Sequence, residues 1–164
     1  ENQNVLTVVA DLEEDISQSV KGVDKVIFAA GSKGKNVTGV DQNGAIKLIE
    51  TSKKEGVKKF VMLSSVGADN PSISKELEDY LKAKQVADKH LTDSGLKYSI
   101  VRPGALTDKD GTDKIELKNK LGKFGKIPRA DVAKTLVEVL NDDVKIDKTF
   151  EIISGDVPIK EALE

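Results

Sequence analysis

Phe60-Val61-Met62-Leu63-Ser64-Ser65 is the stretch of sequence that decides the fold. Four consecutive apolar residues stopped by two serines are typical of a short strand that is covered on both faces. Such strands belong to parallel sheets, in which ligands bind beyond the carboxyl ends of the strands. The stretch therefore predicts an α/β protein with Ser64 and Ser65 at the ligand-binding edge of its sheet.

Similar apolar runs alternate with helical patterns on both sides of this strand. Further strands are predicted at residues 5–10, 26–30, 98–101 and 150–153. Helices are predicted at residues 13–20, 41–55, 74–94 and 131–140, and Pro158 suits the first turn of a terminal helix. Strands that alternate with helices imply right-handed βαβ units, and hence a Rossmann-like, doubly wound parallel sheet with helices on both faces.

The length and composition of the chain restrict what kind of protein this is. With 164 residues, the chain is expected to form a single domain (1–164), in which residues 106–128 make a small irregular excursion on the substrate side. The net charge of −2 argues against a nucleic-acid or anionic-membrane partner. No apolar run approaches the roughly 20 residues that cross a bilayer. We therefore expect a cytoplasmic protein that binds a small molecule, with a homodimer as one possible assembly.

The residue types that are missing or rare exclude several chemistries. The chain has no cysteine, which excludes disulfides, thiolate zinc sites and cysteine nucleophiles. Its single histidine, His90, argues against a histidine metal cluster and a Ser-His-Asp triad. We expect no metal site, and the chemistry must come from Ser, Tyr, Lys, Arg or carboxylate side chains.

Tyr80 and Lys84 stand four residues apart in the predicted helix, so their side chains share one face. An ammonium group favours a neighbouring phenolate, so Lys84 is expected to lower the pKa of Tyr80 from its ordinary value of about 10. Such a phenolate can exchange a proton with a carbonyl or hydroxyl group while a nicotinamide carries the hydride. Pairs of this spacing also arise by chance, which leaves a non-catalytic helix face open.

Several short motifs surround this pair in a fixed order along the chain. In chain order they are Asp11-Leu12, Ala29-Ala30-Gly31, Phe60 through Ser65, Tyr80-Leu81-Lys82-Ala83-Lys84, Arg102-Pro103-Gly104 and Pro128-Arg129-Ala130-Asp131-Val132-Ala133. The ordered set resembles the short-chain dehydrogenase/reductase superfamily, specifically its extended and atypical NAD(P)-binding, epimerase-like members. Tyr80 and Lys84 fit the Tyr-x-x-x-Lys motif of that superfamily.

The resemblance implies a role for each matched position. Tyr80 would be the acid/base, Lys84 would hold the cofactor ribose and Ser65 would hydrogen-bond the reacting oxygen, with Ser64 as the neighbouring candidate. The other implied cofactor-binding residues are Asp11 and Leu12 beside the adenine, Ala29, Ala30 and Gly31 over the ribose, and Arg102, Pro103 and Gly104 beside the nicotinamide.

The sequence departs from the family pattern in two places. Relatives carry a Gly-rich βαβ unit that binds the cofactor pyrophosphate, and residues 1–11 correspond to the strand that follows it. We therefore expect an N-terminally incomplete fold, a longer parent protein and weak NAD(P) binding by this chain alone. Asp41 also stands where many relatives carry an Asn that supports the proton relay, and Asn43 is out of register.

The implied function is an NAD(P)-dependent oxidoreductase or epimerase-like enzyme that acts on a small carbonyl or hydroxyl compound. NADP(H) is the favoured cofactor, although the segment that normally distinguishes it from NAD lies in the part that this sequence does not match. A non-catalytic NAD(P)(H)-binding sensor is the alternative, and a fragment without a ligand is the third.

Overall fold

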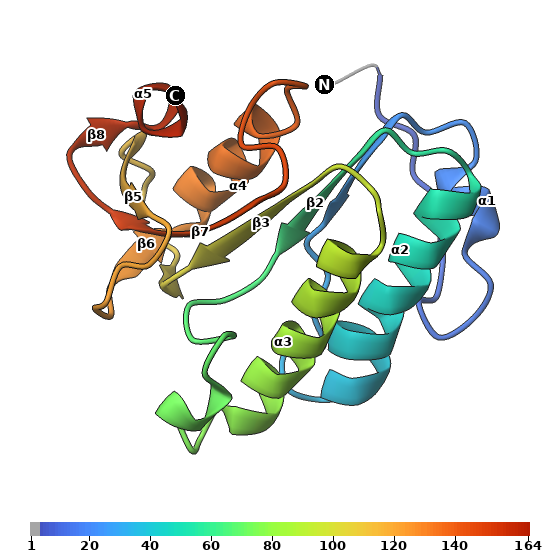
Figure 1. The fold of residues 1–164 in the computed structure, drawn as a ribbon, viewed down its shortest axis with the longest axis horizontal. Coiled ribbons are helices and arrows are strands. Elements are labelled where there is room, and N and C mark those ends of the chain that lie inside the picture. Colours follow the sequence, from blue (N-terminus) through green and yellow to red (C-terminus); the bar gives the residue numbers. More distant parts are fainter. Residues whose placement is uncertain (1–3) are drawn as a thin grey trace.

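A computed structural model describes residues 4–164, and its centre is one six-stranded sheet (Figure 1). The strands run in the order β1 (Lys25–Phe28), β2 (Lys59–Leu63), β3 (Tyr98–Pro103), β7 (Lys148–Ser154), β5 (Lys114–Lys118) and β8 (Val157–Pro158). The pairings from β1 to β7 are parallel, whereas β5 is antiparallel to both β7 and β8. The predicted parallel strands thus form the larger part of a mixed sheet.

Helices cover both faces of the sheet. The helices α2 (Ala45–Lys54) and α3 (Glu78–Asp93) lie side by side on one face, and α4 (Arg129–Glu138) lies on the other (Figure 1). Alternation along β2 explains this arrangement: Phe60 and Met62 belong to a core cluster with Ile49 and Leu91, while Val61 belongs to a second cluster with residues of α4. The structure confirms the Rossmann-like α/β fold.

The remaining elements are short. They are α1 (Ser17–Val20), the π-helical segment η1 (Val37–Gly44), the 3₁₀ turn η2 (Pro71–Ile73), β4 (Ala105–Thr107), β6 (Lys126–Pro128) and the terminal helix α5 (Ile159–Leu163). Two glycines mark helix ends as the sequence predicted. Gly56 follows α2 with φ of 75° and Gly95 follows α3 with φ of 81°, a conformation that side chains with a Cβ rarely adopt.

Three expectations for individual segments are wrong. Residues 5–10 form no strand: they are exposed and pair with none of the strands described, and an apolar run makes a strand only where a neighbour accepts its hydrogen bonds. The helix expected at 13–20 is reduced to α1. The segment 106–128, expected to be irregular, contains β5. This strand pairs with β7 in the main sheet, and Ile115 and Leu117 pack into the second core cluster.

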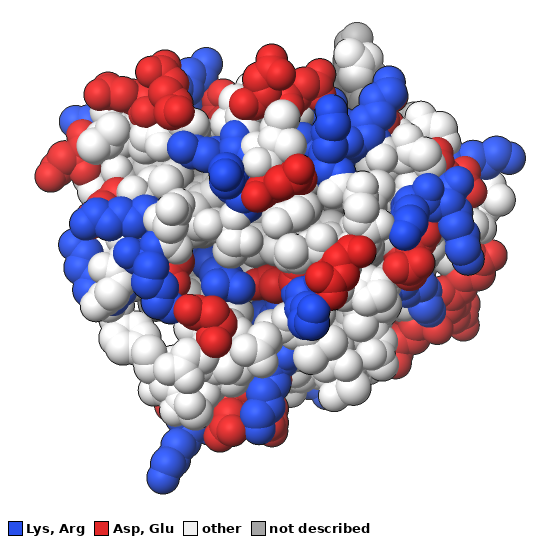
Figure 2. Space-filling view, viewed as in Figure 1, with Lys and Arg blue, Asp and Glu red and all other residues white. Residues whose placement is uncertain are grey.

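Charges of both signs are interspersed over the face shown in Figure 2, and no large single-sign patch appears on it. The exposed charges form ion pairs such as Lys58 with Asp24 at 2.7 Å and Lys89 with Asp93 at 2.6 Å. Within residues 4–164, none of the helices has the length and apolar character needed to cross a membrane.

Candidate active site

A cavity of about 690 Å³ opens where the parallel strands end. The segments after β1, β2 and β3 each contribute to its wall through Gly31, Ser65 and Gly104, and α3 contributes Tyr80 and Lys84. Its volume lies within the roughly 300–1,000 Å³ of small-molecule sites. The cavity therefore occupies the position that the sequence predicted for a ligand.

Lys84 is buried against the floor of this cavity. Its Nζ donates to the Leu63 carbonyl at 3.4 Å and lies 3.8 Å from the Asp41 carboxylate. The same Nζ lies 5.5 Å from the centre of the Tyr80 ring. Burial lowers the pKa of Lys84, and the carboxylates of Asp41 and Asp88 act against that effect. The structure brings Tyr80, Lys84 and Ser65 together around one cavity, and their chemical roles stay predictions.

The expected lowering of the Tyr80 pKa is wrong. Burial raises the pKa of Tyr80 to about 12, and the negative charges of Asp41 and Asp88 add to the shift. The Lys84 ammonium does not reverse this, because the phenol loses water and faces two carboxylates. Tyr80 is therefore a neutral phenol at physiological pH, suited to donate a proton rather than to remove one.

The two serines after β2 face different partners. Ser64 is buried and its Oγ donates to Asp88 Oδ2 at 2.7 Å. Ser65 is half-buried, and its Oγ donates to the Val66 carbonyl at 3.2 Å, a weak local bond. Ser65 thus has the hydroxyl that is freer to reach a ligand, whereas the hydroxyl of Ser64 is engaged within the protein.

Arg102 does not line the cavity, although Pro103 and Gly104 do. Its Nε and Nη2 donate to Asp88 Oδ2 at 3.0 and 2.8 Å, so the guanidinium lies between β3 and α3. The proposed contact of Arg102 with a nicotinamide is therefore not supported by this geometry. Asp88 was not predicted as a site residue. Its spacing of four residues from Lys84 and eight from Tyr80 nevertheless places it on the same face of α3.

Asp41 also lines the cavity. It lies in η1, is buried, and accepts hydrogen bonds at its Oδ2 from the Ser32 backbone N–H at 3.0 Å and the Ser32 Oγ at 2.6 Å. The loop after β1 is thereby fixed next to Lys84. A Cβ at Gly31 would lie 3.1 Å from Asp41 Oδ1, a tight approach that the glycine avoids.

Asp11 and Leu12 lie outside the cavity. Asp11 is exposed and accepts the backbone N–H of Glu13, while Leu12 packs against Gly44 and the first core cluster. Ala29 and Ala30 do line the cavity, as expected from the resemblance. Their neighbours Lys33 and Gly34 line it too and were not among the predicted site residues.

The residues present are compatible with the polar part of a dinucleotide. Buried Lys84 lines the cavity and has donor capacity beyond its one weak bond to Leu63. In the part of the chain that the structure describes, no cluster of three His, Cys, Asp or Glu side chains could hold a metal ion.

Comparisons with known proteins place this chain in a family. A family model described as NAD(P)H-binding matches residues 1–143. The chain is 41% identical to the uncharacterized sugar epimerase YhfK of Bacillus subtilis (strain 168), over 96% of this chain and 77% of that protein.

Two solved structures share the fold closely. The oxidoreductase ylbE of Lactococcus lactis is 34% identical, with a TM-score of 0.91 over 99% of this chain and 78% of that one. A Bacillus halodurans protein, provisionally described as an NAD-dependent epimerase/dehydratase, is 40% identical, with a TM-score of 0.92 over 95% of this chain and 76% of that one. The match of the family model and the identity to YhfK show that this chain belongs to the Rossmann-like NAD(P)H-binding family.

Proposed function

We propose that the chain is an NAD(P)H-dependent reductase of a small carbonyl compound. The observation that carries this proposal is that Tyr80, Lys84 and Ser65 line one cavity at the carboxyl ends of the parallel strands. When bound there, the cofactor would supply a hydride. Tyr80 would donate a proton to the carbonyl oxygen, Ser65 would hydrogen-bond the same oxygen, and Lys84 would hold the cofactor ribose.

The protonation state of Tyr80 is compatible with a role as proton donor in a reduction. A group that starts an epimerisation by removing a proton must be basic near neutral pH. Since burial and two carboxylates raise the pKa of Tyr80 to about 12, its phenol suits the role of a proton donor. The names of the relatives include both epimerase and oxidoreductase, and we take the second class, in which a protonated Tyr80 acts as the donor.

A turnover assay with purified protein tests the proposal. NADPH or NADH is mixed with the chain and a panel of aldehydes and ketones, and oxidation of the reduced nicotinamide is followed by absorbance. We expect oxidation that depends on both protein and carbonyl compound. Binding of NAD(P)H without turnover of any carbonyl compound would instead favour a cofactor sensor.

The cavity wall near Tyr80 suits a substrate with an apolar portion. Leu77 precedes Tyr80 by three residues and is 49% exposed, and Leu106 of β4 is 36% exposed; both line the cavity. A ligand that covers these side chains removes apolar surface from water at a gain of roughly 25 cal/mol per Å². Charged cavity residues, Lys33 and Arg129 among them, leave room for a polar end of the same molecule.

Leu106→Ser is expected to raise the KM for apolar carbonyl substrates roughly 5- to 30-fold, because losing the contact costs about 1–2 kcal/mol. The kcat should change little, since Leu106 does not touch the proton donor. Leu6→Ser is the matched control, because Leu6 is 93% exposed and does not line the cavity. Equal KM values for both variants would remove Leu106 from the substrate site.

A further inference from the structure

Asp88 links three of the elements that surround the cavity. It lies on α3 and is 3% exposed, and its Oδ2 accepts from Ser64 Oγ at 2.7 Å and from Arg102 Nη2 at 2.8 Å. Ser64 and Arg102 continue the register of β2 and β3, in which Leu63 is opposite Val101. One carboxylate oxygen therefore holds the ends of two neighbouring strands against one helix.

Backbone hydrogen bonds connect this junction to the cavity. The Ser64 N–H donates to the Val101 carbonyl at 2.8 Å, and the Val66 N–H donates to the Pro103 carbonyl at 3.0 Å. Ser65 lies between these two bonds, opposite Pro103, so its position depends on how the strand ends are aligned. A shift of Ser64 or Arg102 would move the Ser65 hydroxyl relative to Tyr80.

Asp88 also completes a balanced group of buried charges. The charged groups that face it are Arg102 from β3 and Lys84 from its own helix, with Asp41 from η1 on the other side of Lys84. Arg102 has a second anion nearby, since its Nη1 lies 3.9 Å from Asp69. The other oxygen of Asp88, Oδ1, is buried without a hydrogen-bond partner.

An unpartnered carboxylate oxygen in the interior is costly. The other oxygen, Oδ2, offsets this cost by accepting hydrogen bonds from Ser64 and Arg102. The negative charge is placed where Tyr80 and Lys84 both sense it.

We propose that Asp88 is the positioning residue of the candidate active site, which aligns Ser65 through Ser64 and Arg102 and sets a negative charge near Tyr80 and Lys84. The inference rests on the proposed reductase function, in which Tyr80 donates the proton. Asp88 itself does not line the cavity, so it acts through the residues that do.

The tyrosine content of the chain allows a direct test that needs no substrate. The chain has two tyrosines and no tryptophan, so in a Tyr98→Phe background the tyrosinate absorbance reports Tyr80 alone. We expect Asp88→Asn to shift this titration to lower pH, because a carboxylate that opposes the phenolate is removed. Asp93→Asn is the matched control, because Asp93 lies on the same helix and is 61% exposed in a pair with Lys89.

Steady-state kinetics of the Asp88→Asn variant test the positioning role. In Asp88→Asn we expect kcat to fall on the order of 10- to 100-fold, as misplaced groups around a reacting centre do, with little change in KM. A titration that coincides with that of the Asp93→Asn control would overturn the proposal. An inactive wild type would overturn the reductase function instead, while the titration would still decide whether Asp88 controls Tyr80.

Ser64→Ala covers the case in which Asp88→Asn does not fold. This change removes one bond to Asp88 and leaves every charge in place. It should lower kcat several-fold without moving the Tyr80 titration, because alignment changes and the local charge does not. Unchanged kcat in a folded Ser64→Ala variant would contradict the positioning role.

Discussion

Tyr80→Phe is expected to reduce NAD(P)H-dependent turnover about 10²–10⁴-fold, the usual contribution of a general acid. The substitution removes only the hydroxyl, and the ring keeps its place beside Lys84. The affinity for NAD(P)H should therefore remain near the wild-type value. Steady-state kinetics with the best carbonyl substrate measure the first effect, and calorimetric titration with NADPH and NADH measures the second.

Tyr98→Phe is the natural control for this prediction. Tyr98 is the other tyrosine of the chain, begins β3 and packs against the first core cluster rather than lining the cavity. Its variant should retain wild-type turnover. Equal activity of the Tyr80→Phe and Tyr98→Phe variants would exclude Tyr80 as the proton donor.

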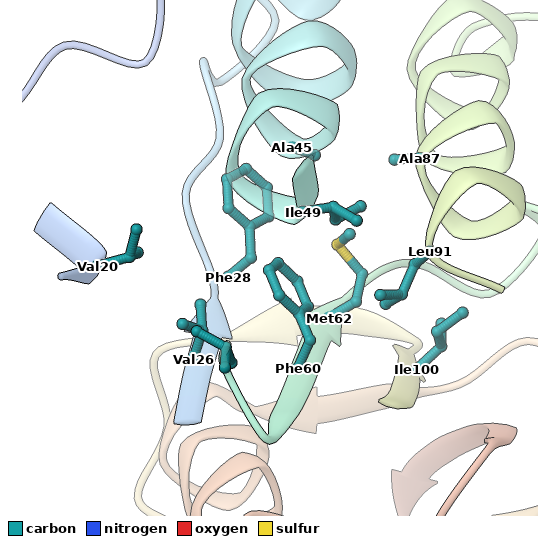
Figure 3. Packing of buried hydrophobic residues seen from close by; sticks show 11 residues of the cluster. Val20, Val26, Phe28, Ala45, Ile49, Phe60, Met62, Ala87, Leu91 and Ile100 are labelled. Atoms are coloured by element: carbon teal, nitrogen blue, oxygen red, sulfur yellow. The ribbon is translucent and has the colours of Figure 1, made fainter. Parts of the chain in front are cut away.

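Phe60→Ala is expected to lower the free energy of unfolding by about 3–5 kcal/mol. The Phe60 side chain is 0% exposed and packs near Phe28 and Met62 in the core beneath α2 and α3 (Figure 3). Its removal combines the loss of apolar burial with a cavity that a parallel sheet under two helices cannot readily close. Denaturant unfolding followed by far-ultraviolet circular dichroism measures the change.

Phe124→Ala provides the matched comparison, because Phe124 is 73% exposed. The same truncation there should change the free energy of unfolding by no more than about 0.5 kcal/mol. If the two variants had equal stability, Phe60 would not be the core residue that the structure shows.

The sequence was most informative where the chain is buried on both faces. The apolar run at 60–63 required cover on each side, and the structure supplies it with α2 and α3 on one face and α4 on the other. The four-residue spacing of Tyr80 and Lys84 likewise placed them on one helix face, because helical geometry is local. The strand ends at Ser65 and Gly104 then located the cavity.

The same signal failed at residues 5–10, where an apolar run lies exposed. A strand depends on a partner elsewhere in the chain, and periodicity carries no information about that partner. The excursion at 106–128 shows the converse case. Its short strand β5 exists because β7 offers a free edge, which a local pattern could not reveal.

What the sequence determined by itself about this protein is its α/β class, the glycines that follow α2 and α3, and the face that carries Tyr80 and Lys84. Only the tertiary structure decided the chemistry of that face. It turned Arg102 away from the cavity toward Asp88, brought Asp41 within 3.8 Å of Lys84 and raised the pKa of Tyr80 to about 12. The physical reason is that burial and charge proximity depend on residues distant in sequence, whereas helix and strand patterns depend on near neighbours.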